Sequence, residues 1–232
     1  FTGVLFRDKI QEAFDNTDDD GHTTMPVISF DYRYSNLCNF KCRMCGEQLS
    51  SSWEAEKKLN NLWTIEEQPF MQKDVKKKMT SFQTEVVEPE FREAISKGIV
   101  EEIYWVGGEP LMYDIHWWAL EEMVKNGSAK NCYLRYNSNL SRTEFKGQKL
   151  FDYLPQFKDW LMCASIDGTG DVVEFIRKGI VWEEWLENFK EGLAAPGGKD
   201  RMRFDLTITG PGMFSIKDLF DLSLELDVKI ET

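Results

Sequence analysis

Three cysteines form the clearest chemical pattern in the chain. Cys38, Cys42 and Cys45 are spaced C-x3-C-x2-C within eight residues, so their thiolates can converge on one soft-metal centre. A [4Fe–4S] cluster normally takes four cysteine thiolates, and a site with three leaves one iron open to another ligand. The spacing therefore favours an iron–sulfur site with an iron that is free to take part in chemistry.

Two other uses of this triplet stay open. A thioredoxin-like C-x2-C motif would need only the last two cysteines and would leave Cys38 without a role. A structural zinc site needs four ligands, usually in two pairs. The remaining cysteines and histidines, Cys132, Cys163, His22 and His116, do not stand at such a spacing. We expect Cys132 and Cys163 to be ordinary core residues.

A second motif, Gly107-Gly108-Glu109-Pro110, directly follows a short apolar stretch that predicts a strand. Two glycines let a ligand approach the backbone closely, the glutamate carboxylate suits an amino group, and the proline stiffens the turn. Alone, this motif would be an ordinary connection between a strand and a helix. We expect it at the same sheet edge as the cysteines, because both motifs follow a predicted strand.

The rest of the chain alternates predicted strands and helices. Such alternation predicts a parallel sheet with right-handed crossovers. The fold class is therefore α/β, a curved partial barrel of about five strand–helix units, with a flat doubly wound sheet as the alternative. The strands are predicted over 28–34, 103–106, 132–136, 160–166 and 202–208, and the helices over 53–62, 89–97, 115–125, 144–153, 172–178, 182–193 and 215–226.

Two serines are predicted to cap helices, Ser51 by accepting from the Glu54 amide and Ser215 in the pattern that ends at Asp218. Residues 63–87 are polar and predict irregular structure. The domain organisation predicted is an N-terminal extension over 1–27, with a short helix near 8–14, and a core domain over 28–232. The first residue is Phe and the last residues read as the start of a strand, so we expect a fragment.

Composition narrows the function classes. The net charge of −12 argues against nucleic-acid binding through the phosphate backbone. No apolar run approaches the ~20 residues that span a bilayer, and no signal peptide opens the sequence. Few cysteines, three of them clustered, indicate a reducing compartment. The expectation is a cytoplasmic protein without membrane or nucleic-acid partners.

The two motifs together resemble the radical S-adenosylmethionine (SAM) superfamily. The resemblance rests on Cys38, Cys42 and Cys45, followed one strand later by Gly107–Pro110. It covers about residues 28–226 and implies a partial (β/α)6-type radical SAM barrel, incomplete at its C-terminal end. The run 35–46, with 50–53 close behind, resembles more narrowly the members with twitch or SPASM auxiliary domains. No cysteine-rich tail for a second cluster follows in this sequence.

The resemblance also implies the cofactors and their ligands. The three cysteines would hold a [4Fe–4S] cluster whose open iron chelates SAM, and the turn Gly107, Gly108, Glu109 and Pro110 would bind the methionine amino group. The backbone of Met44 would face the adenine. Ser165 and Asp167 look like ribose and carboxylate contacts, and Arg177 looks like the partner of the SAM carboxylate. Weaker candidates at strand ends are Asn137, Asn139, Thr207 and Thr209.

Each of the weaker candidates has a plainer reading. Ser165 could satisfy a backbone group, Asp167 could belong to a turn, and Arg177 could be a surface residue of a helix. The function that the resemblance implies is reductive cleavage of SAM to a 5′-deoxyadenosyl radical that abstracts hydrogen from a peptide or protein substrate, with flavodoxin or ferredoxin as electron donor. The competing class is a non-catalytic iron–sulfur or zinc-binding interaction module.

Overall fold

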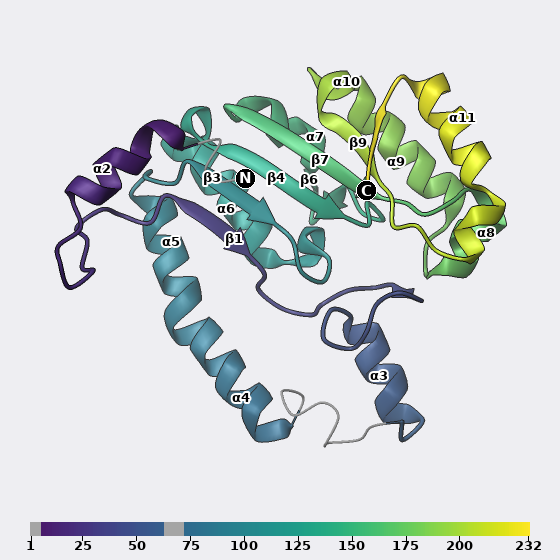
Figure 1. Cartoon of the computed structure of the whole chain (residues 1–232), viewed down its shortest axis with the longest axis horizontal. Coiled ribbons are helices and arrows are strands. Elements are labelled where there is room, and N and C mark those ends of the chain that lie inside the picture. Colours follow the sequence, from purple (N-terminus) through teal and green to yellow (C-terminus); the bar gives the residue numbers. More distant parts are fainter. Residues whose placement is uncertain (1–5, 63–71) are drawn as a thin grey trace.

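A six-stranded parallel sheet forms the centre of the protein (Figure 1). The computed structural model describes residues 6–62 and 72–232. The sheet confirms the predicted α/β fold, and the C-terminal residues form a sixth strand that extends the predicted five. In spatial order the strands are β1 (Ser29–Tyr32), β3 (Glu102–Trp105), β4 (Tyr133–Ser138), β7 (Asp159–Ser165), β9 (Met202–Asp205) and β10 (Lys229–Glu231).

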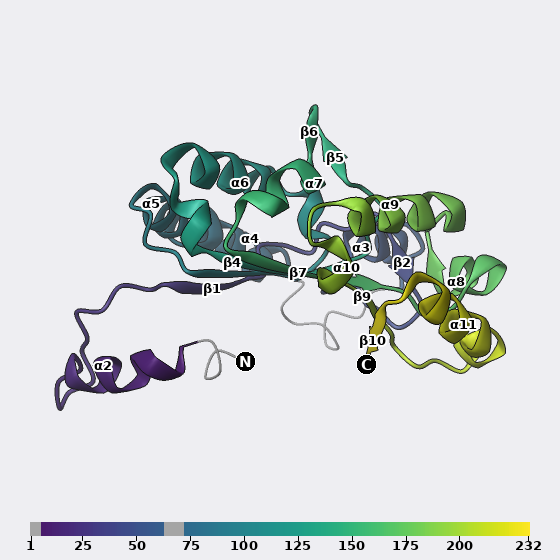
Figure 2. The ribbon, with the colours of Figure 1, turned by 90° about the horizontal axis from the view of Figure 1, so that it is seen from above.

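Helices connect successive strands, and α5, α6 and α9 lie together over one face of the sheet (Figure 2). None of the helices in the described parts of the chain is long and apolar enough to cross a bilayer. The helices are α2 (Ile10–Asp15), α3 (Ser51–Leu59), α4 (Lys73–Phe82), α5 (Glu88–Ser96), α6 (Asp114–Asn126), α7 (Leu150–Tyr153), α8 (Gly170–Ile176), α9 (Trp182–Ala194), α10 (Gly198–Arg201) and α11 (Ile216–Leu226).

The two faces of the sheet differ because successive side chains of a strand point to opposite sides. The helix-covered face carries large apolar side chains that are buried, among them Ile103, Trp105, Leu134, Tyr136, Met162 and Phe204. The opposite face carries mainly polar side chains that are partly exposed, with the buried Leu161 and Cys163 of β7 among them. The polar side chains are Tyr104, Arg135, Asn137, Ser165 and Asp205. Hydrophobic burial therefore holds the helices to one side and leaves a mainly polar face on the other.

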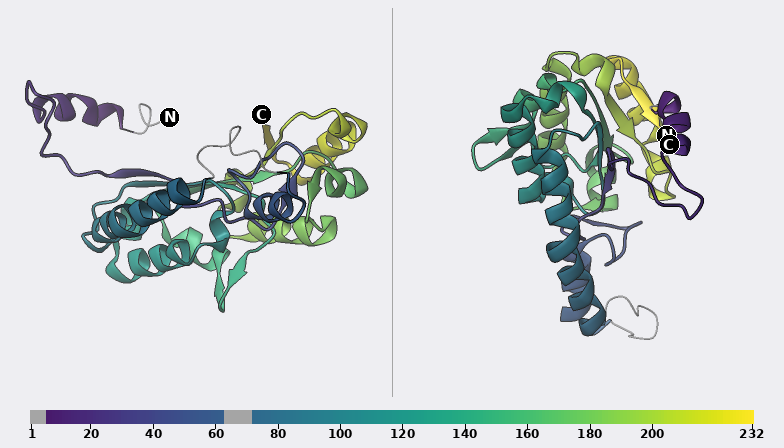
Figure 3. Two further views of the ribbon diagram at one scale, coloured as in Figure 1. Left: turned by 90° about the horizontal axis from the view of Figure 1, so that it is seen from below. Right: turned by 90° about the vertical axis from the view of Figure 1, so that its left-hand side faces the viewer.

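The sheet is open at both ends. Within residues 6–62 and 72–232, β1 pairs only with β3 and β10 pairs only with β9, which agrees with a partial barrel. The N-terminal α2 lies apart from the sheet and is joined to β1 by an extended stretch (Figure 3). An ion pair between Lys9 and Glu101 links this segment to the residues before β3.

Two local predictions were wrong. Residues 144–149 form a hairpin of β5 (Glu144–Phe145) and β6 (Gln148–Lys149) rather than a helix. Lys146 and Gly147 take positive φ values of 50° and 81°, which suits a two-residue hairpin turn. Residues 73–87 are helical, since a π-helical turn, Gln83–Val87, joins α4 to α5, while residues 63–71 of the predicted irregular segment lie outside the described residues.

Of the two predicted caps, Ser51 was wrong, while Ser215 is confirmed as the N-cap residue of α11 but makes no side-chain cap hydrogen bond. The cap of α3 is Ser50, whose hydroxyl accepts from the amide of Trp53 at 3.2 Å. Ser215 does precede α11, but its hydroxyl accepts from the amide of Thr169 at 3.2 Å instead of capping its own helix. A serine run offers several hydroxyls for one cap, and the sequence alone does not say which one faces the helix end.

Candidate metal centre

The cysteine loop is held in place by the first turn of α3. The hydroxyl of Ser51 accepts from the amide of Cys38 at 3.1 Å, and the hydroxyl of Ser52 donates to the Cys38 carbonyl at 2.8 Å. The indole of Trp53 donates to the carbonyl of Cys42 at 2.9 Å. The serines after the motif therefore satisfy the backbone of the loop, which fixes the positions from which the thiols project.

The glycine turn, Gly107–Pro110, packs directly against residues 35–37, the segment that leads into the cysteine loop. The amide of Gly108 donates to the Ser35 carbonyl at 3.2 Å, and the amide of Glu109 donates to the Leu37 carbonyl at 2.7 Å. A Cβ on Gly108 would lie 2.4 Å from that same Leu37 oxygen. Gly107 has a φ of 109°, which favours glycine. Both glycines thus permit the close approach of one stretch of this chain to another.

The carboxylate of Glu109 is buried and engaged with its own chain. One oxygen accepts from the Leu111 amide at 3.1 Å and from the Ser138 hydroxyl at 2.8 Å, and the other accepts from the Asn139 amide at 2.7 Å. Burial raises the pKa of Glu109 to about 7, although these hydrogen bonds oppose the rise. The carboxylate ties the turn to the end of β4, while its role toward a ligand amino group stays a prediction.

Asn139 connects the end of β4 to the first cysteine. Its side-chain amide lies 3.8 Å from the Cys38 sulfur and donates to the Asn39 side chain at 3.0 Å. The Phe40 amide also points to the Cys38 sulfur, at 3.5 Å. Donors aimed at a sulfur stabilise the thiolate form, which is the form that binds a metal. Asn139, a weak candidate in the sequence, therefore lies in the site.

Arg177 and Asp167 form a buried ion pair beside the second cysteine. The pair is held by two contacts, from the Arg177 Nη2 to Asp167 Oδ1 at 2.8 Å and from Nε to Oδ2 at 2.6 Å. The other terminal nitrogen, Nη1, lies 3.9 Å from the sulfur of Cys42. Arg177 is only 8% exposed, so it is not a surface helix residue.

The three thiols fit a cluster site by their chemistry and position. Cys38 and Cys42 are buried, while Cys45 is partly exposed. Burial raises the pKa of Cys38 to about 11. The hydrogen bond between the other two thiols raises the pKa of Cys42 and lowers the pKa of Cys45 to about 6. Among the described residues, no three His, Cys, Asp or Glu side chains are placed to share a single metal ion, whereas the cysteines of a cubane bind separate irons.

A second cluster of polar side chains lies at the same sheet edge, on the face opposite α5, α6 and α9. Asn137 accepts from the Tyr104 hydroxyl at 2.6 Å and donates to Asp205 at 2.8 Å, and the Ser165 hydroxyl donates to Asp205 at 3.2 Å. Sequence reasoning missed Asp205, the acceptor that joins this group. The predicted strand 202–208 could have indicated it, because Asp205 lies two residues before the candidate Thr207 and residues two apart on a strand point to the same side.

The remaining candidates have fewer contacts with the site. Met44 has an exposed side chain. The Thr207 amide donates to Asp167 at 3.0 Å, while the Thr209 hydroxyl accepts from the Gly212 amide at 3.0 Å. Roles for these residues toward a ligand stay predictions.

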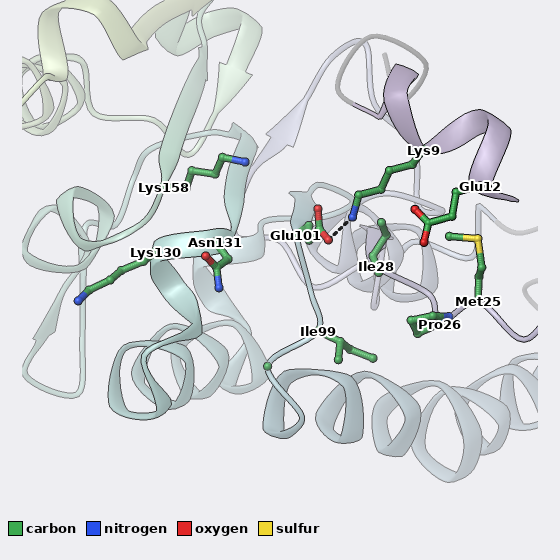
Figure 4. A pocket seen from close by; sticks show the side chains of 11 residues that line it. Lys9, Glu12, Met25, Pro26, Ile28, Ile99, Glu101, Lys130, Asn131 and Lys158 are labelled. Atoms are coloured by element: carbon green, nitrogen blue, oxygen red, sulfur yellow. Dashed lines mark hydrogen bonds and ion pairs between the residues drawn. The ribbon is translucent and has the colours of Figure 1, made fainter.

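Two of the cavities lined by the described residues lie at opposite ends of the strands. One of about 460 Å³ lies at the N-terminal ends of the strands, between the N-terminal segment and Lys130 and Lys158 (Figure 4). The other, of about 270 Å³, opens beside Gly107, where Leu49 and Met79 also line it. Ligands of parallel sheets bind at the C-terminal ends of the strands. The smaller cavity is therefore the one that adjoins the candidate centre.

Fold and site together define a partial α/β barrel with a cysteine-rich centre at the C-terminal edge of its sheet. A family model described as the radical SAM superfamily matches residues 32–213. The chain belongs to the radical SAM superfamily. This match covers the cysteine loop, the glycine turn and the strands β2 to β9, while only the last residue of β1 and none of β10 falls within it.

Solved structures of SuiB from Streptococcus suis are similar in fold. The structure bound to S-adenosylmethionine has a TM-score of 0.51 and 13% sequence identity, and it covers 97% of this chain and 43% of its own. The structure bound to the precursor peptide SuiA has a TM-score of 0.52 and 14% identity, with 97% and 42% covered. The chain thus spans less than half the length of SuiB. No curated protein sequence matches it.

Proposed function

We propose that the chain binds a [4Fe–4S] cluster through Cys38, Cys42 and Cys45, binds SAM beside it, and serves a radical SAM enzyme that modifies a peptide or protein. The contact between the two motifs carries this proposal. The Glu109 amide donates to the Leu37 carbonyl at 2.7 Å, so the residue before the first cysteine touches the glycine turn. A ligand of the open iron would lie within reach of both.

The residues of the chain divide the work of such a site. The thiolates hold the cluster, and the buried positions of Cys38 and Cys42 keep water from it. When bound, the cluster and SAM supply a one-electron cleavage that yields methionine and a 5′-deoxyadenosyl radical. The backbone of the turn, Gly107–Pro110, is proposed to orient the methionine amino group, and Met44, Ser165 and Asn137 are proposed to contact the nucleoside.

The substrate part of the proposal rests on the mainly polar face of the sheet, opposite α5, α6 and α9. Tyr104, Asn137 and Asp205 form a hydrogen-bonded row there, at the edge that holds the cysteines. Such a row offers donors and acceptors to a peptide backbone. SuiB, whose fold is similar, has been solved with its precursor peptide, which supports a peptide substrate and the twitch or SPASM subgroup as the specific hypothesis.

The proposal extends to an electron donor and a compartment. A flavodoxin or ferredoxin would supply the electron, and the protein would act in the cytoplasm. All five cysteines are free thiols, which is consistent with a reducing compartment.

Anaerobic reconstitution with iron and sulfide tests the proposal. We expect about four irons per chain and 5′-deoxyadenosine that forms only with SAM and a reductant, measured by liquid chromatography. Cys42→Ala should lose the iron, whereas Cys132→Ala, at a buried cysteine just before the N-terminal end of β4, should keep it. A fully loaded cluster without SAM cleavage would indicate a non-catalytic iron–sulfur module. Stoichiometric zinc that outcompetes iron would indicate a zinc module instead.

A further inference from the structure

A short antiparallel pairing brings Arg177 to the cysteine loop. Strand β2 (Lys41–Cys42) pairs with β8 (Arg177–Lys178), so that Cys42 lies opposite Arg177 in register. The Arg43 amide continues the pairing by donating to the Ile176 carbonyl at 2.8 Å. Backbone hydrogen bonds thus fix the distance between Cys42 and Arg177, although 135 positions separate them in the sequence.

The guanidinium is oriented by the carboxylate behind it. Asp167 is 1% exposed. Its Oδ1 accepts hydrogen bonds from Arg177 Nη2 at 2.8 Å and from the Thr207 amide at 3.0 Å, and its Oδ2 lies 2.6 Å from Arg177 Nε in an ion-pair contact. Because the guanidinium is planar and rigid, a carboxylate that holds Nε and Nη2 on one side directs the remaining nitrogen away from that carboxylate. That nitrogen, Nη1, lies 3.9 Å from the Cys42 sulfur. The positive end of the buried pair therefore faces the candidate cluster.

A fixed positive charge beside an iron–sulfur cluster favours the reduced state, because reduction adds one negative charge to the cluster. Hydrogen bonds to the sulfurs, local net charge and solvent exposure are the levers that set such potentials. The interaction is effective here because Cys42 and Arg177 are buried, at 6% and 8% exposure, so solvent screens the charge weakly.

We propose that the positive charge of Arg177 raises the reduction potential of the cluster, and that Asp167 is the positioning residue that holds the guanidinium beside the Cys42 sulfur. The proposal rests on the proposed function, since it requires a [4Fe–4S] cluster at the three cysteines. The step concerned is the uptake of one electron, from an added reductant such as dithionite, by the oxidised cluster. It differs from the SAM-carboxylate contact that the family resemblance implies for this arginine.

Redox titration followed by electron paramagnetic resonance, without SAM, tests this inference. In Arg177→Met the ratio of reduced to oxidised cluster at a fixed potential should fall about tenfold, which for one electron is a midpoint about 59 mV more negative. Asp167→Asn removes the opposing negative charge and should move the midpoint in the positive direction. Arg177→Lys keeps the charge and should lie between Arg177→Met and the wild type.

A matched arginine elsewhere serves as control. Arg201 also pairs with an aspartate, Asp159, at 2.6 Å. Asp159 is the first residue of β7, so this ion pair lies at the end of the strand opposite to the cysteine loop. Arg201→Met should leave the midpoint unchanged.

Iron content distinguishes failure of this inference from failure of the proposed function. Absence of iron in the wild type would refute the proposed function itself. A loaded Arg177→Met with the wild-type midpoint would overturn the inference and, if its SAM affinity fell, would support the SAM-carboxylate role. Shifts of the same sign in Arg177→Met and Asp167→Asn would likewise overturn it, since opposite charges must act in opposite directions. If Arg177→Met does not load, Arg177→Lys and Asp167→Asn still decide the sign.

Discussion

An alanine at Gly108 would place its Cβ 2.4 Å from the carbonyl oxygen of Leu37 and 2.8 Å from the carbonyl carbon of Asn36. Real Cβ atoms essentially never approach other atoms closer than 3.0 Å. Both neighbours are backbone atoms, so no side chain can rotate away. The glycine turn and the stretch before Cys38 must therefore separate by at least about 0.6 Å.

The cost follows from two contributions. Overpacking of this kind costs about 1–3 kcal/mol. The same displacement weakens the hydrogen bond from the Glu109 amide to the Leu37 carbonyl, which is 2.7 Å long, and a lost hydrogen bond costs about 0.5–1.5 kcal/mol. We expect Gly108→Ala to lower the free energy of unfolding by about 2–4 kcal/mol.

Urea unfolding of the metal-free chain, followed by tryptophan fluorescence, measures this change. Gly210→Ala is the matched control, because Gly210 is exposed, has a φ of −53° and has no atom within 4 Å of its Cβ position. It should unfold within about 0.5 kcal/mol of the wild type. In reconstitution, Gly108→Ala should bind less iron than Gly210→Ala, since the cysteine loop has moved.

Equal stability of Gly108→Ala and Gly210→Ala would refute the reasoning, because it would mean that the turn and the loop do not touch as described. Normal stability with loss of SAM binding alone would instead favour the sequence-based reading, in which the glycines make room for a ligand.

Two further predictions concern pH. Burial opposes ionisation of Glu54, but hydrogen bonds from Lys58 and Lys76 lower its pKa to about 2. Its stabilisation is therefore complete above about pH 4.5 and is lost as the pH falls toward 2. Glu54→Gln should cost about 1–2 kcal/mol at pH 7, since both lysines are partly exposed, and nothing near pH 2. An equal cost at both pH values would contradict the ion pairing. His116 is buried against the Tyr136 hydroxyl at 3.0 Å, and burial lowers its pKa to about 3. Its folded pKa lies below the unfolded value of 6.5, so stability should fall as the pH drops from 6.5 to 3. In His116→Gln this part of the pH dependence should be absent, and its persistence would contradict burial as the cause. Denaturant unfolding across pH measures both.

The family and the sheet edge could be predicted from sequence, because both depend on local patterns. The spacing of Cys38, Cys42 and Cys45 is fixed along the chain, and so is the position of Gly107–Pro110 after an apolar strand. Alternating strands and helices then require a parallel sheet, whose strand ends meet at one edge. The β10 strand was visible only as a short apolar start, and the structure pairs it with β9.

The local sequence pattern gave wrong predictions where it fitted two structures about equally well. The predicted helix over 144–153 contains good helix formers, yet Lys146 and Gly147 turn the chain into a hairpin. The serine run at 50–52 offers three hydroxyls, of which Ser50 caps the helix and the other two bind the backbone of Cys38. Which hydroxyl faces which group depends on how the loop lies on α3.

The tertiary structure alone decided the partners of the buried polar groups. The sequence indicated Glu109 and Arg177 as ligand contacts. In the fold the first binds the end of β4 and the second binds Asp167 and faces Cys42. Asp205, which no motif marked, joins Asn137 and Ser165. A buried polar side chain must find a partner wherever neighbouring strands bring one, and strand order and register, which the sequence does not state, determine who that neighbour is.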